Sequence, residues 1–274
     1  MNIQNEAGFA AVQSAFDRSL SLEEIRQRAP AVFATAPSDR LSQRYIFIQT
    51  QRVLEGLAGA GFVPTEARQW LGRRSDAQHA RHMIRLRRRC ETVALHECVP
   101  EVVFLNSHNG SSGYQLRMGI FRALCTNGLI VSVAMFPAFC VSHRKDVVDE
   151  AIAGALSLAE RFDELGVLIE RMQRRQLSTP EQARFAEQAM QLRYPVLADA
   201  GVTPTQLLHV RRPEDDGADL WRTFNRVQEN LLRGGFRKHS ANGRVTAARR
   251  ISSISEDVRI NGALWDLSSN LVAA

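Results

Sequence analysis

Three arginines alternate with aliphatic residues in a short segment that has the pattern of a strand. They are Arg85, Arg87 and Arg89, and Ile84 and Leu86 alternate with them. Because successive side chains of a strand point to opposite faces, the three guanidinium groups share one face and the aliphatic side chains share the other. A guanidinium group is planar and presents a fork of donors that matches phosphate. The alternation therefore predicts a surface or groove that contacts the phosphate backbone of a nucleic acid.

The same segment holds further basic residues, and we expect Arg81 to join these phosphate contacts. The others are Arg68, Arg73, Arg74, His79, His82 and Arg88. The alternative is a solvated strand whose arginines pair with acids across the sheet. The nearest acids are Asp76, Glu91, Glu97 and Glu101, which we count as too few to pair with every arginine. Phosphate binding is therefore favoured, and counterion release would make it steeply salt-dependent.

A second basic cluster lies in the polar segment 237–250, and no acidic residue occurs between Asn230 and Ser255. Its members are Arg237, Lys238, Arg244, Arg249 and Arg250. A basic loop between two helices could close over a nucleic-acid backbone, whereas the alternative is a disordered connector. Three aromatic residues near the two clusters could stack on bases, as in single-strand binders, although each taken alone fits a core position better. They are Phe236, Tyr114 and Phe121.

The serine- and histidine-containing segment 106–112 suggests nucleophilic catalysis, because it includes Ser107, His108, Ser111 and Ser112. A catalytic triad also needs an acid that orients the histidine, and the sequence identifies none. The GxSxG pattern of a nucleophile elbow is absent as well. Asn-Gly at positions 109 and 110 strongly favours a tight hairpin turn, so we interpret the segment as a turn and predict no catalytic residues.

No metal or cofactor site is predicted. His96, Cys98 and Cys90 lie close together but lack the paired spacing of a zinc site. The glycines at 56, 59 and 61 have the dinucleotide-binding pattern in the wrong order, and no Walker pattern occurs.

The predicted elements divide the chain into a strand-rich first half and a helix-rich second half. Strands are expected at residues 45–50, 67–71, 82–89, 101–105, 114–118, 129–135 and 138–143. Helices are expected at 21–29, 51–58, 146–174, 178–194, 219–232 and 255–272. This order predicts an α+β fold in which an antiparallel sheet packs with helices. We place a strand-rich core with N-terminal helices at 1–145 and a helical region at 146–274, packed as one continuous domain.

The length and the amino-acid composition predict a soluble cytoplasmic protein. The 274 residues are 45% hydrophobic, which is enough for a substantial core, and no apolar stretch or leader pattern suggests a membrane span or a signal peptide. The four cysteines lack a disulfide framework, so reduced thiols are expected.

Of the 35 basic residues only Lys145 and Lys238 are lysines, so 33 are arginines. A GC-rich genome would produce the same bias, and the position of the arginines must decide between the explanations.

Three stretches resemble the YubP/YafZ/YfjQ family, a domain of unknown function carried by conjugative plasmids and prophages. They are Ser107-His-Asn-Gly-Ser-Ser-Gly-Tyr-Gln-Leu with its continuation to Leu129, Asp219-Leu-Trp-Arg-Thr-Phe-Asn-Arg-Val-Gln-Glu-Asn-Leu-Leu-Arg-Gly-Gly and Arg259-Ile-Asn-Gly-Ala-Leu-Trp. The resemblance covers most of the chain and implies a mobile-element protein in a bacterial cytoplasm. The family more often has aspartate where this chain has Asn109. The resemblance supplies no established activity and no catalytic residues.

The first hypothesis is a protein that binds single-stranded DNA and could anneal it. Strands followed by a long helix are reminiscent of the β-β-β-α core of single-strand annealing recombinases, an analogy of fold that does not fix function. Because such proteins often form rings, a homo-oligomer would fit. The second hypothesis is an anti-defence or regulatory protein that binds a host protein, with the helix at 146–174 as its contact or oligomer surface.

Overall fold

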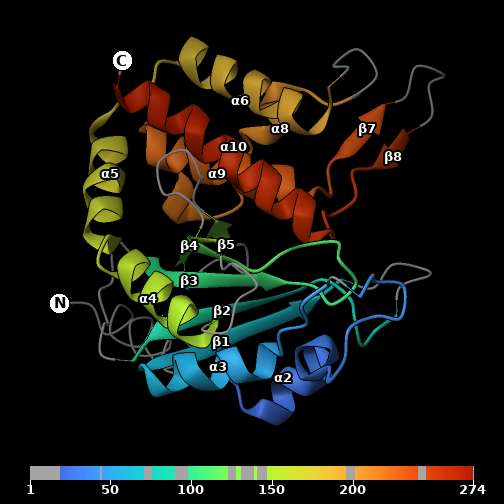
Figure 1. Ribbon diagram of the computed structural model, residues 1–274. Helices are drawn as coiled ribbons and strands as arrows, with labels where there is room; N and C mark the ends of the chain where they lie inside the picture. The colour runs from blue at the N-terminus through green and yellow to red at the C-terminus, as the bar shows by residue number, and fades with distance from the viewer. Residues whose placement is uncertain are drawn as a thin grey trace, which may run out of the picture. The chain divides into compact units, whose positions relative to one another are not determined.

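The fold is α+β, as the sequence predicts, and the chain divides after Phe162 into two compact units (Figure 1). We call them the sheet unit and the helical unit. The computed structural model describes residues 19–43, 45–70, 76–89, 98–122, 128–130, 139–140, 147–195, 201–239 and 245–273. Among these residues, no helix combines the length and the apolar character needed to cross a membrane.

The sheet unit is built on an antiparallel sheet with the strand order β1-β2-β3-β4-β5, and β6 also pairs with β4. Its strands are β1 (Phe62–Gln69), β2 (His82–Arg88), β3 (Cys98–Asn106), β4 (Gln115–Arg122), β5 (Gly128–Ile130) and β6 (Phe139–Cys140). The register places Arg85 of β2 opposite Glu66 of β1 and Val103 of β3. Residues that are far apart in sequence therefore share one face of the sheet.

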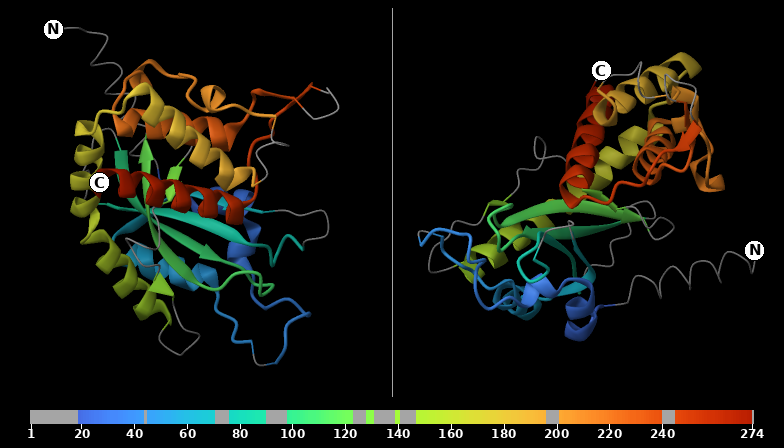
Figure 2. Two further views of the ribbon diagram at one scale, coloured as in Figure 1. Left: turned by 90° about the horizontal axis from the view of Figure 1, so that it is seen from above. Right: turned by 90° about the vertical axis from the view of Figure 1, so that its right-hand side faces the viewer.

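The helices α3 and α4 cover the face of this sheet that lies opposite Arg85, as Figures 1 and 2 show. The helical elements of the unit are α2 (Leu22–Arg28), the 3-10 helix η1 (Pro30–Phe33), α3 (Thr50–Gly59) and α4 (Val147–Ala159). Helix α3 contacts β1, and α4 contacts β3, β4 and α3. A β-carbon added at Gly56 would collide with Val148, so this glycine lets the two helices approach closely. The core beneath them includes the fully buried Leu57, Ile84 and Phe104.

Local signals predict where the helices α2, α3 and α4 begin but misplace one strand. Ser21 caps α2 at the predicted start of that helix, through a capping box with Glu24. The prediction of a strand at 45–50 is wrong, because the described residues before Thr50 form no strand and Thr50 already begins α3. The aromatic and aliphatic residues of that segment instead serve an irregular connection, in which the Ile48 carbonyl accepts a hydrogen bond from Tyr114 Oη.

The helical unit packs around α9, which is buried along nearly its whole length. Its elements are α5 (Phe162–Arg174), α6 (Thr179–Arg193), α8 (Pro204–Leu207), the 3-10 helix η2 (Pro213–Asp215), α9 (Leu220–Arg233), β7 (Arg237–His239), β8 (Val245–Ala247) and α10 (Ile254–Ala273). Helix α9 contacts α6, α8 and α10. Phe224 of α9 stacks on Trp221 and meets Trp265 of α10 edge-on, at a centroid distance of 6.1 Å. This aromatic group joins the two segments of this unit that carry the family resemblance, which begin at Asp219 and at Arg259.

The single long helix predicted at 146–174 is two helices in the structure, α4 and α5, with a break at Glu160 and Arg161. The Arg161 amide donates to the Leu158 carbonyl in a tight turn that ends α4. The apolar spacing continues through the break, and neither proline nor glycine marks it. The break falls within a few residues of the boundary between the two units.

Candidate nucleic-acid interface

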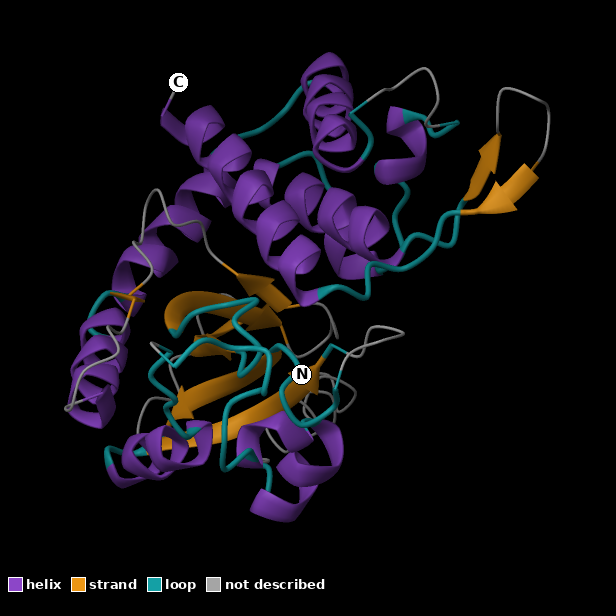
Figure 3. Cartoon of the chain, turned by 45° about the vertical axis from the view of Figure 1, so that its right-hand side comes forward, coloured by secondary structure: helices purple, strands orange, loops and turns teal. Residues whose placement is uncertain are grey.

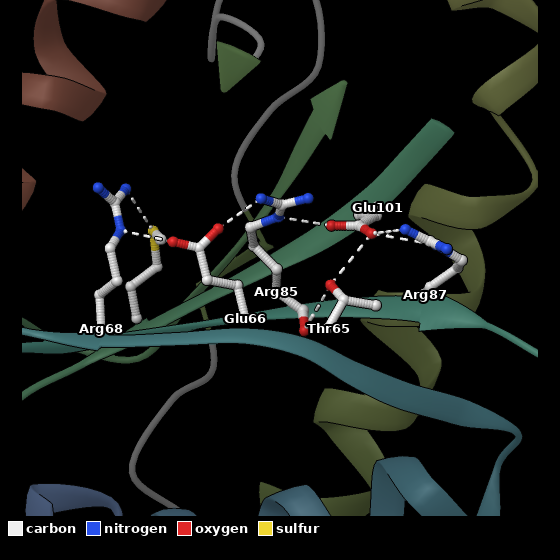
Figure 4. A network of polar contacts seen from close by, with 7 residues as sticks. Thr65, Glu66, Arg68, Arg85, Arg87 and Glu101 are labelled. Atoms are coloured by element: carbon white, nitrogen blue, oxygen red, sulfur yellow. Dashed lines mark hydrogen bonds and ion pairs between the residues drawn. The ribbon is translucent and has the colours of Figure 1, made fainter. Parts of the chain in front are cut away.

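The arginines of the sheet form a network with two glutamates, which Figure 4 shows in a row across β1, β2 and β3. Glu101 is completely buried, and its carboxylate accepts from Arg85 Nε at 2.6 Å and from Arg87 Nη2 at 2.6 Å. Arg85 Nη1 also donates to Glu66, at 2.5 Å, and Thr65 Oγ1 donates to Glu101. Register explains the network, because β1 and β3 flank β2 and bring both carboxylates to the face that Arg85 and Arg87 share.

For Arg85 and Arg87 the structure has the alternative arrangement, in which arginines pair with acids across the sheet. The side chains of Arg85 and Arg87 are only 14% and 11% exposed. The guanidinium carbon of Arg85 also lies 3.3 Å from the centroid of the Phe121 ring, a cation–π contact. Removing one partner of a buried charge pair is strongly destabilising, because the other charge is left uncompensated. Arg85, Arg87 and Glu101 therefore depend on one another inside the sheet, and the assignment of these two arginines to phosphate contacts stays a prediction.

The other two arginines predicted in this cluster have different surroundings. Arg81 is half-buried and donates from Nη2 to the Ser111 carbonyl in the connection between β3 and β4, and burial lowers its pKa. Arg89 directly follows β2 and is exposed. Its backbone amide donates to the Gly61 carbonyl, and no acidic side chain among the described residues pairs with its guanidinium group. Of the four sheet arginines that we predicted as phosphate contacts, Arg89 is the most accessible.

A buried polar cluster at the edge of the sheet unit contains the histidine of the segment 106–112. Thr50 Oγ1 lies 2.9 Å from His82 Nε2 and 3.2 Å from His108 Nε2, and it accepts from Asn106 Nδ2 at 3.0 Å. All four side chains are completely buried. The predicted hairpin of β3 and β4 is confirmed, with Gly110 at a positive φ of 76°, but residues 107–114 join the strands in a longer connection than the predicted tight turn. His108 thus anchors that turn to α3.

The hydrogen bonds of His82 indicate its tautomer. His82 Nδ1 lies 3.0 Å from the Ala80 carbonyl and donates to it, so a neutral His82 accepts from the Thr50 hydroxyl at Nε2. Burial lowers the pKa of His82 to about 4, and burial together with the neighbouring His82 lowers the pKa of His108 to about 3. Both imidazoles are therefore neutral. A separate observation is that, among the described residues, no group of three or more potential ligands could hold a metal ion.

The second basic segment is not a loop, because residues 237–239 and 245–247 pair as the antiparallel hairpin β7–β8 (Figure 3). Backbone hydrogen bonds join its base to the end of α9, from Gly235 N to the Ala248 carbonyl at 2.8 Å and from Ile251 N to the Leu232 carbonyl at 2.9 Å. Gly234 ends α9 with a positive φ of 63°, and a β-carbon there would lie 2.5 Å from the Ala248 carbonyl oxygen. Glycine is therefore required where the hairpin leaves the helix.

The basic side chains of β7 and of the segment that follows β8 lack acidic partners among the described residues. Arg237, Arg249 and Arg250 are exposed, and Lys238 is half-buried with Nζ 4.8 Å from the centroid of the Tyr194 ring. Arg193 lies over the same ring and donates to the carbonyls of Leu231 and Arg249, which ties the end of α6 to the base of the hairpin. Arg244 lies outside the described residues. Around the hairpin there is thus positive charge that no acidic side chain among the described residues neutralises.

Of the aromatic residues predicted near the arginines, only Phe236 is available for stacking on a base. Tyr114 is buried, with its hydroxyl donating to the Ile48 carbonyl, and Phe121 is buried under Arg85. Phe236 is half-buried and lines a pocket beside the hairpin together with Arg211. Sequence reasoning missed Arg211 and also Glu66, the partner of Arg85. Glu66 could have been found only from the pairing register of β1 with β2. That register was not predictable from the sequence.

These features define an α+β protein with an antiparallel sheet, a helical unit and an exposed basic hairpin. The chain belongs to the family described as "Domain of unknown function (DUF932)", whose model matches residues 38–265. It is 37% identical to the UPF0380 protein YafZ of Escherichia coli strain K12 over 260 residues and 37% identical to the UPF0380 protein YfjQ of the same strain over 257 residues. Each comparison covers 93% of both chains, and the predicted resemblance is confirmed. No solved structure matches the chain significantly.

Proposed function

We propose that this protein binds nucleic acid, with single-stranded DNA as its preferred ligand, through the β7–β8 hairpin of the helical unit. The observation that carries the proposal is the accessible positive charge of Arg237, Lys238, Arg249 and Arg250, none of which pairs with an acidic side chain among the described residues. An unpaired guanidinium group can exchange its counterions for phosphates without first breaking an internal ion pair.

The anchoring of the hairpin supports the same proposal. Arg193, Gln206 and the backbone of the segment 248–251 hold it by hydrogen bonds, and Gln206 Nε2 donates to the Arg237 carbonyl at 2.9 Å. Binding therefore orders fewer residues than it would in a disordered connector, so less of the binding free energy is lost to chain entropy. Annealing and homo-oligomer formation extend this proposal and need no covalent chemistry.

The decisive test is fluorescence anisotropy of a labelled single-stranded oligonucleotide, titrated with protein over a salt series. We expect tight binding at low salt with a negative slope. The variant Arg237→Gln with Lys238→Gln should reduce the magnitude of that slope by about 1.4, because each phosphate neutralised on a single strand contributes about 0.7.

The matched control is Arg171→Gln with Arg174→Gln, which removes the same formal charge from exposed positions on α5. This control should leave the slope nearly unchanged. Absence of binding by the unaltered protein at low salt would refute the proposal and direct attention to a host-protein partner. An equal reduction of the salt slope in both variants would show that net charge, rather than the hairpin, attracts the oligonucleotide.

A further inference from the structure

A pocket of about 590 Å³ lies beside the hairpin within the helical unit. Its volume falls in the range of roughly 300–1,000 Å³ that is typical of pockets for small ligands. It is lined by Thr203, Thr205, Gln206, His209, Arg211, Asn230, Gly235 and Phe236. No acidic residue is among these, so the lining combines one permanent positive charge with hydroxyl groups, an imidazole and an aromatic ring.

The guanidinium group of Arg211 is held in a fixed orientation at this pocket. Its Nε donates to Asn230 Oδ1 at 2.5 Å, and its Nη2 donates to the Gly234 carbonyl at 2.5 Å. Asn230 is 1% exposed, and its Nδ2 donates to the carbonyls of Leu207 and His209 at 2.9 and 2.8 Å. Asn230 is therefore a positioning residue that holds both Arg211 and the segment carrying His209.

The charge of Arg211 differs from that of the adjacent Arg212. Arg212 donates from Nε and Nη2 to the buried carboxylate of Glu229, at 3.1 and 3.0 Å, and Arg233 also pairs with that carboxylate. Arg211 makes its two hydrogen bonds to neutral oxygens, and no acidic side chain among the described residues pairs with it. Its positive charge is thus oriented but not neutralised, which is the arrangement that a bound phosphate requires.

We infer that this pocket binds one nucleotide of a single strand, with its base against Phe236 and its phosphate on Arg211. The inference rests on the proposed function and adds where a base is held and why a single strand is preferred. Base–aromatic stacking tolerates any sequence, since every base has a π face. The hydrogen bond from Gln206 to the Arg237 carbonyl places the hairpin at the edge of the pocket, so one strand can reach both. The bases of a duplex are paired and stacked, and they cannot enter without being unpaired.

The test compares three labelled ligands of equal length at one low salt concentration: a single-stranded oligonucleotide, an abasic strand with the same phosphates, and a duplex. Phe236→Leu should weaken binding of the ordinary single strand about tenfold, in keeping with the loss of one stacking contact, and should leave abasic binding unchanged. Arg211→Gln should weaken binding of both single strands, because both carry the phosphate. Phe33→Leu, at a half-buried phenylalanine of the sheet unit, is the matched control and should change neither.

The outcomes separate this inference from the proposed function. If the unaltered protein binds no oligonucleotide, the proposed function fails and the pocket assignment fails with it. If the protein binds and the double hairpin variant weakens that binding, but Phe236→Leu has no effect or weakens abasic binding equally, only the pocket assignment is overturned. A circular-dichroism spectrum of each variant checks folding, and Arg211→Lys, which keeps the charge, should recover part of the lost affinity.

Discussion

Arg85 and Arg87 on the sheet and Arg237 and Lys238 on the hairpin differ in what surrounds their charges. The sheet pair shares the carboxylate of Glu101, Arg85 also pairs with Glu66, and both arginines are largely buried. The hairpin pair has no acidic partner among the described residues, and Arg237 is exposed. Both segments are rich in basic residues, so their density alone does not distinguish a structural cluster from a binding cluster. The distinction depends on whether neighbouring strands bring acids into register.

The largest effect is expected from breaking the sheet network at its centre. Glu101→Gln would leave Arg85 and Arg87 with a neutral partner in a buried position, which should lower the free energy of unfolding by about 3–5 kcal/mol. Urea unfolding followed by circular dichroism measures this loss. The matched control is Glu256→Gln, which breaks the exposed pair with Arg259 and should cost less than about 1 kcal/mol. Equal losses in the two variants would contradict a structural role for the sheet arginines.

Acid should weaken the sheet unit through its buried histidines. Because the pKa of His82 is about 4 and that of His108 about 3, both stay neutral when folded, whereas the unfolded chain takes up protons below about pH 6.5. The stability that the neutral histidines provide is complete above pH 6.5 and is lost as the pH falls toward these folded values. The expected loss is about 1.4 kcal/mol per pH unit for each histidine, measured by urea unfolding between pH 7 and pH 5.

The control for the acid effect is His209→Gln, which removes an exposed histidine of the helical unit. This variant should keep the full pH dependence. A flat stability profile in the unaltered protein between pH 7 and pH 5 would show that the two buried histidines are not neutral in the folded state.

A smaller effect is expected from crowding the arginine face of the sheet. A β-carbon at Gly119 would lie 2.6 Å from Phe121 Cε2 and 2.9 Å from Val103 Cγ2. Gly119→Ala should therefore displace the ring that stacks on Arg85 and lower the free energy of unfolding by about 1–3 kcal/mol. Gly59→Ala is the matched control, since a β-carbon there meets no heavy atom within 4 Å. No difference between the two alanine variants would mean that the Phe121 contact contributes nothing to the network.

The smallest effect on stability is expected at the hairpin. Arg237→Gln with Lys238→Gln should change the free energy of unfolding by less than about 0.5 kcal/mol, because neither charge has an ion-pair partner among the described residues. The same variant should show the largest change in oligonucleotide binding. Urea unfolding and anisotropy on one protein preparation compare the two quantities. A large loss of stability in this double variant would contradict the distinction between the ion-paired sheet arginines and the hairpin charges.

Local sequence predicted the elements whose ends carry their own signals. The helices predicted from residues 21, 178 and 219 begin where expected, with Ser21, Ser178 and Asp219 as the N-caps of α2, α6 and α9. The period-2 pattern likewise located β2, and Asn-Gly located the turn after β3. These features depend on residues within a few positions of each other, so one chain without homologues is sufficient to identify them.

Tertiary structure decided every feature that depends on distant partners. The sequence by itself determined the α+β order, the helix starts and the two basic segments. It did not determine that Glu66 and Glu101 would flank Arg85, because strand register is set by packing. The orientation of Arg211 likewise follows from the buried amide of Asn230. Which arginines are neutralised and which remain available is therefore a property of the fold, since ion pairing depends on distances that the sequence does not specify.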